Sequence, residues 1–278
     1  AWNRLGEPRL SSVRVYGLRR TRYRPLRRQV GLEAGELLAP GDPALARRRV
    51  GAVPAFSSSR VDLRPPEGGR AELEVAVVER PLLPTSAPDV AAAALRGLVE
   101  RELGVTASSP AGSGGAATAS WRWWSGRPRV RLRLEAPAAL GVPGVWTATA
   151  GWERPTFGGV SAADGPRLRE ERRGGGLALS RWVSPGLRLE AGAGLDRWSG
   201  LGTRARLTGE VGARALADRL AARLSLGAWT GEGRDFGRAA LETALRTAPA
   251  RGAGLRVAAT FAAADGAGPR TLWPGAGT

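Results

Sequence analysis

The chain has 278 residues with 42 basic and 25 acidic side chains, a formal net charge of +17, and neither cysteine nor histidine. Without these two residue types, zinc fingers, haem-histidine sites, disulfide frameworks and Cys- or His-based nucleophiles are excluded, and a metal site would have to consist of carboxylates alone. All of the basic residues are arginines, and lysine and isoleucine are absent, which is typical of a GC-rich genome and weakens the inference from net charge to nucleic acid binding.

The first part of the chain has the pattern of a small α+β unit. Segment 12–16 alternates apolar and polar residues and predicts a strand. Apolar residues at helical spacing predict a helix in 21–31, and Asp42 before Pro43 is placed to cap a second helix. Two alternating runs, 61–64 and 71–77, flank the turn residues Pro65 to Gly69 and predict a hairpin. The predicted order is strand, helix, helix, strand, strand.

This order and three short phrases resemble a POTRA (polypeptide-transport-associated) domain. The phrases are Val15–Arg22, Val53–Val61 and Val77–Pro81, and the match covers nearly all of residues 11–81. The resemblance implies that residues 1–81 are a periplasmic domain that captures client chains by adding a strand to an open sheet edge. We expect the client-binding edge in the hairpin, at Val61, Leu63, Leu73 and Val75.

Residues 82–104 are predicted to be a linker. Asp89 could cap a short helix here, although the same stretch could equally lead into the first strand of the next domain.

From about residue 105 the apolar residues recur with a period of two. No run of about twenty apolar residues occurs, so a transmembrane helix is excluded. The alternating segments are about ten residues long, which suits a strand that crosses a bilayer, and we expect about ten of them. The clearest are 116–124, 129–135, 146–153, 187–196, 204–214, 220–228 and 255–262.

The two faces of these strands differ in chemistry, since a row of arginines cannot face hydrocarbon. We therefore expect the apolar face to meet lipid and the charged face to line a hydrated lumen with Arg129, Arg131, Arg133, Glu190, Arg206 and Glu210. Tryptophans near the segment ends are expected to form an interfacial girdle, namely Trp121, Trp123, Trp146, Trp152, Trp182, Trp198 and Trp229.

A POTRA-like unit followed by such strands resembles the outer-membrane assembly factors of the BamA/TamA type. The resemblance implies an outer-membrane β-barrel in residues 105–278 that inserts or translocates unfolded polypeptides and contacts outer-membrane lipid. Because the barrels of that family have about sixteen strands, we expect an incomplete barrel and a piece of a longer protein. We expect the weakly closed barrel seam at Val105, Ala107, Trp121 and Trp123.

Two other functions remain possible on the sequence alone. A secretion-type barrel could carry a lipid hydrolase or a passenger upstream, although no Gly-x-Ser-x-Gly motif occurs in this chain. A soluble, basic, β-rich protein could bind nucleic acid, and it would present arginines and aromatic residues together on one exposed face. For the barrel interpretation, we expect no enzymatic activity, no catalytic residue, no cofactor, no metal, no small-molecule substrate and no nucleic acid partner.

Overall fold

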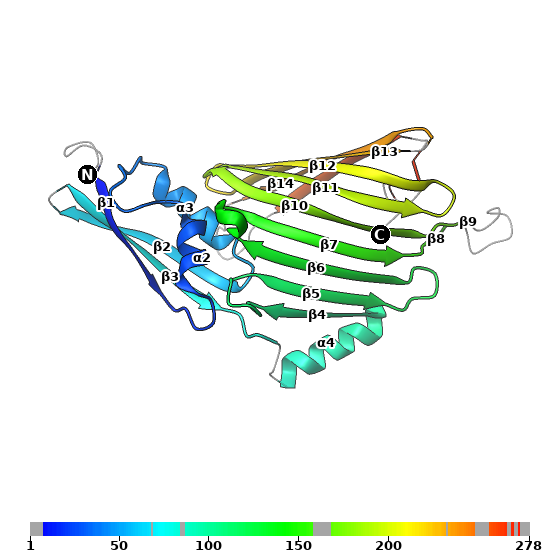
Figure 1. Ribbon diagram of the computed structural model, residues 1–278, viewed down its shortest axis with the longest axis horizontal. Coiled ribbons are helices and arrows are strands. Elements are labelled where there is room, and N and C mark those ends of the chain that lie inside the picture. The colour runs from blue at the N-terminus through cyan, green and yellow to red at the C-terminus, as the bar shows by residue number, and fades with distance from the viewer. Residues whose placement is uncertain are drawn as a thin grey trace.

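The computed structural model describes residues 8–67, 69–83, 87–157, 168–231, 233–247, 256–265, 268–269 and 272. Two sheets of very different size dominate the described part of the chain, and they lie end to end along its long axis (Figure 1). Among the described helices, none has the length and hydropathy that crossing a membrane would require.

The smaller sheet belongs to an α+β unit whose elements follow the predicted order. Strand β3 lies in the middle of this sheet, with β1 parallel to it on one side and β2 antiparallel on the other. The elements are β1 (Arg9–Tyr16), α2 (Tyr23–Val30), α3 (Asp42–Gly51), β2 (Phe56–Glu67) and β3 (Arg70–Glu79). The core of the unit is built from side chains of all five elements, including Leu10, Leu26, Val30, Val50, Val61, Leu73 and Val75.

Two local expectations for this unit are wrong. Asp42 is the first residue of α3, and its carboxylate accepts a hydrogen bond from the Ala39 backbone N–H (2.8 Å) instead of capping the helix. Strand β2 continues through Glu67, so Pro65 and Pro66 lie in the strand and not in the turn. Proline is tolerated there because β2 is an edge strand.

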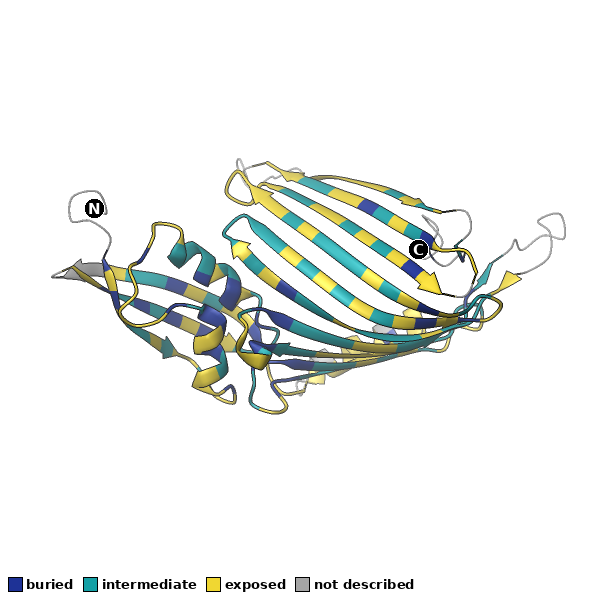
Figure 2. Cartoon of the chain, turned by 45° about the horizontal axis from the view of Figure 1, so that its top comes forward, coloured by how far each residue is buried: buried dark blue, intermediate teal, exposed yellow. Residues whose placement is uncertain are grey.

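The larger sheet has ten antiparallel strands and curls like the wall of a barrel (Figure 2). Its strands neighbour one another in chain order, from β4 at one end to β15 at the other, and β8 and β9 form a separate pair. The ten strands of the sheet are β4 (Glu102–Ser108), β5 (Ala116–Arg122), β6 (Arg129–Pro137), β7 (Val145–Glu153), β10 (Arg172–Ser184), β11 (Leu187–Trp198), β12 (Gly202–Ala215), β13 (Leu220–Gly231), β14 (Phe236–Arg246) and β15 (Arg256–Ala264). The separate pair is β8 (Thr156–Phe157) and β9 (Leu168–Arg169).

The segment between the two sheets contains a helix, α4 (Ala87–Glu100), and β4 begins directly after it at Glu102. Helix α4 lies beside β4 (Figure 1). Asp89 lies in the first turn of α4, and its side chain is outside the described residues. The chain therefore leaves the α+β unit through a helix, reaches the far end of the large sheet, and returns towards the α+β unit in β4.

The α+β unit is seated on the turns of the large sheet that face it. Helix α2 contributes Gln29, whose Oε1 accepts a hydrogen bond from the N–H of Gly144 (2.9 Å). Helix α3 contributes Arg48, which donates to the Pro185 carbonyl (2.9 Å) and forms an ion pair with Asp218. On the opposite side of the contact, Ala55 N–H donates to the Gly114 carbonyl (3.1 Å). The position of the unit is thus fixed by several turns that are far apart in sequence.

Gly17, which follows β1, has a φ of 86° and lies against β3. A Cβ atom there would collide with the carbonyl oxygen of Val77, whereas Gly35, with a φ of 94°, has open space around its Cα. Both positions strain an L-residue, but only Gly17 also lacks room.

We expect Gly17→Ala to lower the free energy of unfolding by about 1–3 kcal/mol more than Gly35→Ala, because overpacking adds to the backbone strain. Urea unfolding of the two variants checks this difference. Equal midpoints would show that the contact between Gly17 and Val77 relaxes at no cost.

Candidate functional site

One face of the large sheet is apolar across all ten strands, apart from arginines near the ends of β10 and β11. The strand register joins Val105, Ala119, Leu132, Ala150, Gly175, Leu195 and Ala205 into one row from β4 to β12. A second row continues the face from β11 to β15 through Leu189, Val211, Leu224, Leu241 and Phe261. The large side chains of these rows are exposed, for example 60% for Leu195 and 65% for Phe261. We call this surface the outer face.

The opposite face carries the charged residues, and we call it the inner face. The structure places all six residues that we expected to line a lumen on this face: Arg129, Arg131, Arg133, Glu190, Arg206 and Glu210. Arg131, Arg206 and Glu210 form ion pairs with neighbouring strands, whereas Arg133 and Glu190 pair within their own strands.

Three carboxylates organise these ion pairs. Glu102 accepts from Arg122 and Arg129, with N–O distances of 2.6 Å to both. Glu153 lies between Arg131 (3.3 Å) and Arg172 (3.2 Å). Because most of the arginines on these strands are paired, the inner face does not resemble the unpaired basic surface that binding to a nucleic acid backbone requires.

Asp196 is the third carboxylate and the most buried of them, with no exposed side-chain surface. It accepts hydrogen bonds from Arg172 (2.9 Å), Arg206 (3.1 Å) and the indole N–H of Trp229 (2.7 Å). A buried carboxylate needs this degree of pairing, since an isolated charge in such a place is strongly disfavoured. The sequence showed Asp196 only as one polar residue in an alternating segment, so its central position was missed.

The tryptophans divide between the two faces. Trp121, Trp146 and Trp152 lie on the outer face near strand ends, as expected for a girdle. For Trp198 and Trp229 the expectation is wrong, because both are buried on the inner face in a cluster with Phe236 and Leu272. Trp182 also faces inwards, where Arg48 (5.2 Å) and Arg214 (5.7 Å) lie over its ring.

A polar hollow of about 430 Å³ lies on the inner face between β5 and β12. Its wall includes Thr118, Ser120, Arg131, Glu153, Arg172 and Asp196. Within the described ranges, no group of three or more acidic residues is placed to hold a metal ion. The charged side chains of this wall belong to the ion pairs of Glu153 and Asp196 described above.

The edges of the small sheet correct one predicted site. Leu73 and Val75 lie on β3, which is paired on both sides, so neither belongs to an open edge. Leu73 and Val75 lie in the middle of the sheet because β3 pairs in parallel with β1, the first strand of the unit. The sequence pattern of the hairpin does not reveal this non-local pairing. Val61 and Leu63 do lie on an edge strand, β2, although Val61 is fully buried and Leu63 packs on the core.

Only one of the two edges of this sheet is accessible along most of its length. The start of β1 is covered, since Leu10 N–H donates to the Glu36 carbonyl (2.8 Å) and Gly35 N–H donates to the Leu10 carbonyl (2.7 Å). Further along β1, the Tyr23 hydroxyl donates to the Val13 carbonyl (2.9 Å). On β2, Arg80 donates to the carbonyl of Phe56, the first residue of the strand (3.1 Å). Further along β2, Arg47 donates to the Val61 carbonyl (2.9 Å).

The backbone groups at the β2 edge follow from this bond, because successive residues of a strand point to opposite sides. Val61 directs its carbonyl away from β3, and therefore Ser59 and Leu63 do the same with their N–H and C=O groups. Residues Arg60 and Asp62 pair with β3. The β2 edge thus presents Ser59, Val61 and Leu63 to an incoming strand.

The large sheet has a comparable edge at β4. The structure gathers the four expected seam residues at this end, with Val105 and Ala107 on β4, Trp121 on β5 and Trp123 just after it. Ser108 N–H donates away from β5 to the Leu82 carbonyl (2.9 Å), so Gly104 and Thr106 also point their backbone groups away from β5. The pairing groups of the edge are therefore those of Gly104 and Thr106, not those of Val105 and Ala107.

Comparison with known proteins finds similarity at the level of structure. The sequence matches no protein-family model and no curated protein. The fold is similar to BamA from Haemophilus ducreyi lacking POTRA domains 1–3, with 11% identity and a TM-score of 0.51 over 93% of this chain and 56% of that chain. It is also similar to CdiB from Escherichia coli, with 11% identity and a TM-score of 0.58 over 93% of this chain and 54% of that chain. For CdiB from Acinetobacter baumannii the identity is 10% and the TM-score 0.51, over 92% of this chain and 53% of that chain.

These values describe a shared fold. The chain spans little more than half the length of each of the three structures. The matched share of this chain exceeds the large sheet alone, so the similarity includes residues of the α+β unit.

The pairing of Asp196 predicts its contribution to stability. We expect Asp196→Asn to lower the free energy of unfolding by about 3–5 kcal/mol, because the largely buried Arg206 loses its counter-charge and Arg172 keeps only Glu153. Glu190→Gln is the matched control: Glu190 pairs with Arg188 in a more exposed setting, and its loss should cost at most about 1 kcal/mol. Urea unfolding of the detergent-solubilised chain, followed by tryptophan fluorescence, measures both. Equal effects would contradict the central position of Asp196.

Proposed function

We propose that the chain is part of an outer-membrane protein that inserts or translocates other polypeptides. The observation that carries the proposal is the outer face, which stays apolar through the register of ten adjacent strands. A soluble protein rarely exposes so large an apolar surface, and a lipid bilayer is the environment that matches it. Strands β10 to β13 have 12 to 14 residues, enough to cross the hydrocarbon at the usual tilt.

The α+β unit then belongs on the periplasmic side as a POTRA-like domain. Support comes from its strand and helix order and from a fold similarity that extends beyond the large sheet into this unit. The unit meets the large sheet at the turns around Gly144, Pro185 and Asp218. These turns mark the periplasmic end of the strands, and the loops near Trp152 and Trp198 mark the outer end.

Client capture would use the open edge of β2. Backbone N–H and C=O groups at Ser59, Val61 and Leu63 can pair with an extended segment of a client, and this pairing depends little on the client sequence. Arg47 would have to release the Val61 carbonyl as the client strand arrives. The partners are accordingly unfolded outer-membrane or secreted polypeptides, and no bond-making chemistry is needed.

The β4 edge would be the second point of contact. Gly104 and Thr106 offer backbone groups at membrane depth, where an unpaired amide is strongly disfavoured and an added strand is stabilised. The inner face beside this edge is wet and charged, and the outer face is apolar. A client segment with alternating polar and apolar residues would match both sides.

The bilayer assignment is tested by introducing the same residue on each face of one strand. Leu207 points outwards from β12 and its neighbour Thr208 points inwards. Leu207→Arg should disfavour insertion into lipid vesicles by about 2–4 kcal/mol near the midplane, whereas Thr208→Arg should have little effect. Refolding yield into phosphatidylcholine vesicles measures this. If the two variants insert equally well, the outer face does not meet hydrocarbon.

Client capture is tested at Ser59. Ser59→Pro removes an N–H that points away from β3 and should weaken the binding of an extended, unfolded client peptide about three- to tenfold, the contribution of one hydrogen bond. Ser59→Ala retains the N–H and should bind like the unmodified chain. Fluorescence anisotropy of a labelled peptide gives the affinities, and circular dichroism verifies folding. Unchanged affinity in a folded Ser59→Pro variant would rule out β2 as the client edge.

A further inference from the structure

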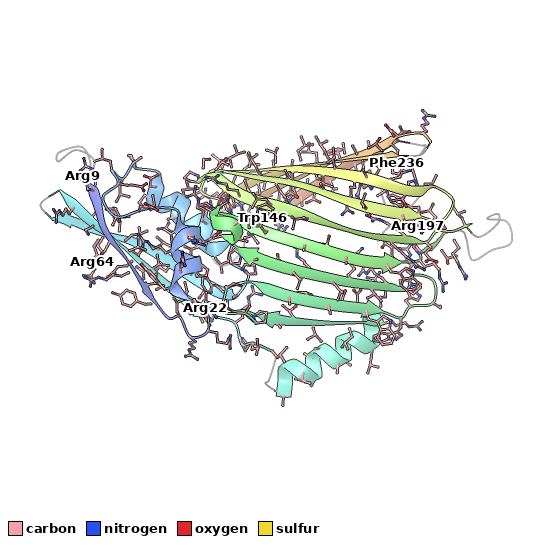
Figure 3. The ribbon with its side chains drawn as sticks, in the orientation of Figure 1. Arg9, Arg22, Arg64, Trp146, Arg197 and Phe236 are labelled. Atoms are coloured by element: carbon pink, nitrogen blue, oxygen red, sulfur yellow. The ribbon has the colours of Figure 1, made fainter. Side chains whose placement is uncertain are left out.

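Two arginines face outwards at the end of the large sheet that lies away from the α+β unit. Arg173 on β10 and Arg197 on β11 are directly opposite each other in the strand register. The same register places Trp152 on one side of this pair and Thr203 on the other. Figure 3 shows Arg197 at this end, opposite the end where the α+β unit is attached.

Like charges that face each other across two strands destabilise a sheet unless a counter-charge lies between them. The inner face shows how this chain compensates such a pair: Glu190 and Glu210 are also directly opposite, and Arg188 contacts both of them. The outward pair has no comparable bridge. Arg173 is paired with Glu171, with N–O distances of 3.0 and 2.8 Å, whereas exposed Arg197 makes no ion pair with any other described residue.

The charges around this pair leave it positive. Glu171 is the carboxylate that contacts it, and hydrogen bonds from Arg173 and Trp152 lower the pKa of Glu171, so it stays ionised. Arg154 lies over the ring of Trp152 at 5.7 Å and adds a third guanidinium. Among the described residues, Arg197 therefore has no counter-charge and no acceptor for its fork of N–H donors.

The surroundings indicate what kind of anion would fit. Along the strands towards the middle of the sheet, the next pairs on the outer face are Gly175 with Leu195 and then Leu177 with Ala193. Leu195 is 60% exposed and Leu177 is 49% exposed, so the apolar surface begins directly beneath the arginines. Trp152 lies in the arginine row, at the depth where tryptophans mark a membrane interface.

We propose that Arg173 and Arg197 bind the phosphate of a lipid headgroup in the leaflet away from the α+β unit. A guanidinium fork matches phosphate oxygens in a bidentate manner, and Thr203, opposite Arg197 in the register, adds a hydroxyl to the same row. The acyl chains of the same lipid would lie on Leu195 and Leu177. A free phosphate ion would use the arginines but not this apolar surface. The inference rests on the proposed location in an outer membrane.

The test uses the full chain in uncharged detergent micelles and two lipids that differ only in phosphate. Phosphatidate and diacylglycerol with brominated acyl chains quench tryptophans that they contact, and the quenching curves give the preference of the chain for the phosphorylated lipid. We expect this preference to fall about fivefold in Arg197→Ser and about thirtyfold in Arg173→Ser/Arg197→Ser. Arg197→Lys keeps the charge but loses the fork and should fall between the unmodified chain and Arg197→Ser.

Arg238→Ser is the matched control, because it removes one exposed arginine from the inner face and should leave the preference unchanged. A preference that survives the double substitution, or that Arg238→Ser lowers equally, overturns the site. Full competition by inorganic phosphate at the concentration of the lipid would indicate a free-anion site and overturns the lipid assignment. Quenching by neither lipid would instead contradict the membrane location itself, so the two failures are distinguishable.

Discussion

Hydrogen bonding between antiparallel strands is the constraint on which this structure depends. Each ladder fixes which residues lie opposite each other, and alternate residues then point to opposite faces. A slip of one residue between β11 and β12 would bring Arg206 to the surface where Leu207 now lies. The register of all ten strands keeps the leucines on one face and most of the arginines on the other, with Arg173, Arg181 and Arg197 as outward exceptions near the ends of β10 and β11.

The charge of the chain is distributed according to this separation. On the inner face, glutamates and Asp196 lie between arginines of neighbouring strands, so the large positive charge is locally compensated. Buried pairing of this kind contributes little net stability, but it makes the arrangement specific, because removing one partner leaves another unpaired. Arg197 is different because it faces outwards and has no carboxylate partner in the described part of the chain. An arginine in that setting is suited to a ligand from outside the chain.

Much of the fold could be predicted from the sequence because its patterns are local. Alternation gives the strands of the large sheet, and helical spacing with turn residues gives α2 and α3. Strand β10 was missed because Gly174, Gly175 and Gly176 lack the side chains that would display the alternation. Strand order was missed as well: Leu73 and Val75 alternate like edge residues, and only the distant β1 makes β3 central.

The candidate sites depend even more on non-local pairing. The apolar residues around Trp198 and Trp229 recur with a period of two, but this pattern does not show which face of the sheet the two rings occupy. Their position beside Asp196 follows from the packing of neighbouring strands. The opposition of Arg173 and Arg197 likewise arises from the register of β10 and β11, and their separation in sequence gives no sign of it.

Helix α4 determines the direction in which β4 runs. Its 14 residues carry the chain to the far end of the sheet, because a helix rises about 1.5 Å per residue. Strand β4 must then run back towards the α+β unit, so a new strand that joins it in antiparallel fashion would start near that unit and finish at the opposite rim. The geometry of one short helix thereby sets a polarity: under the proposed function, a client that docked with its leading end beside the α+β unit would extend towards the opposite rim.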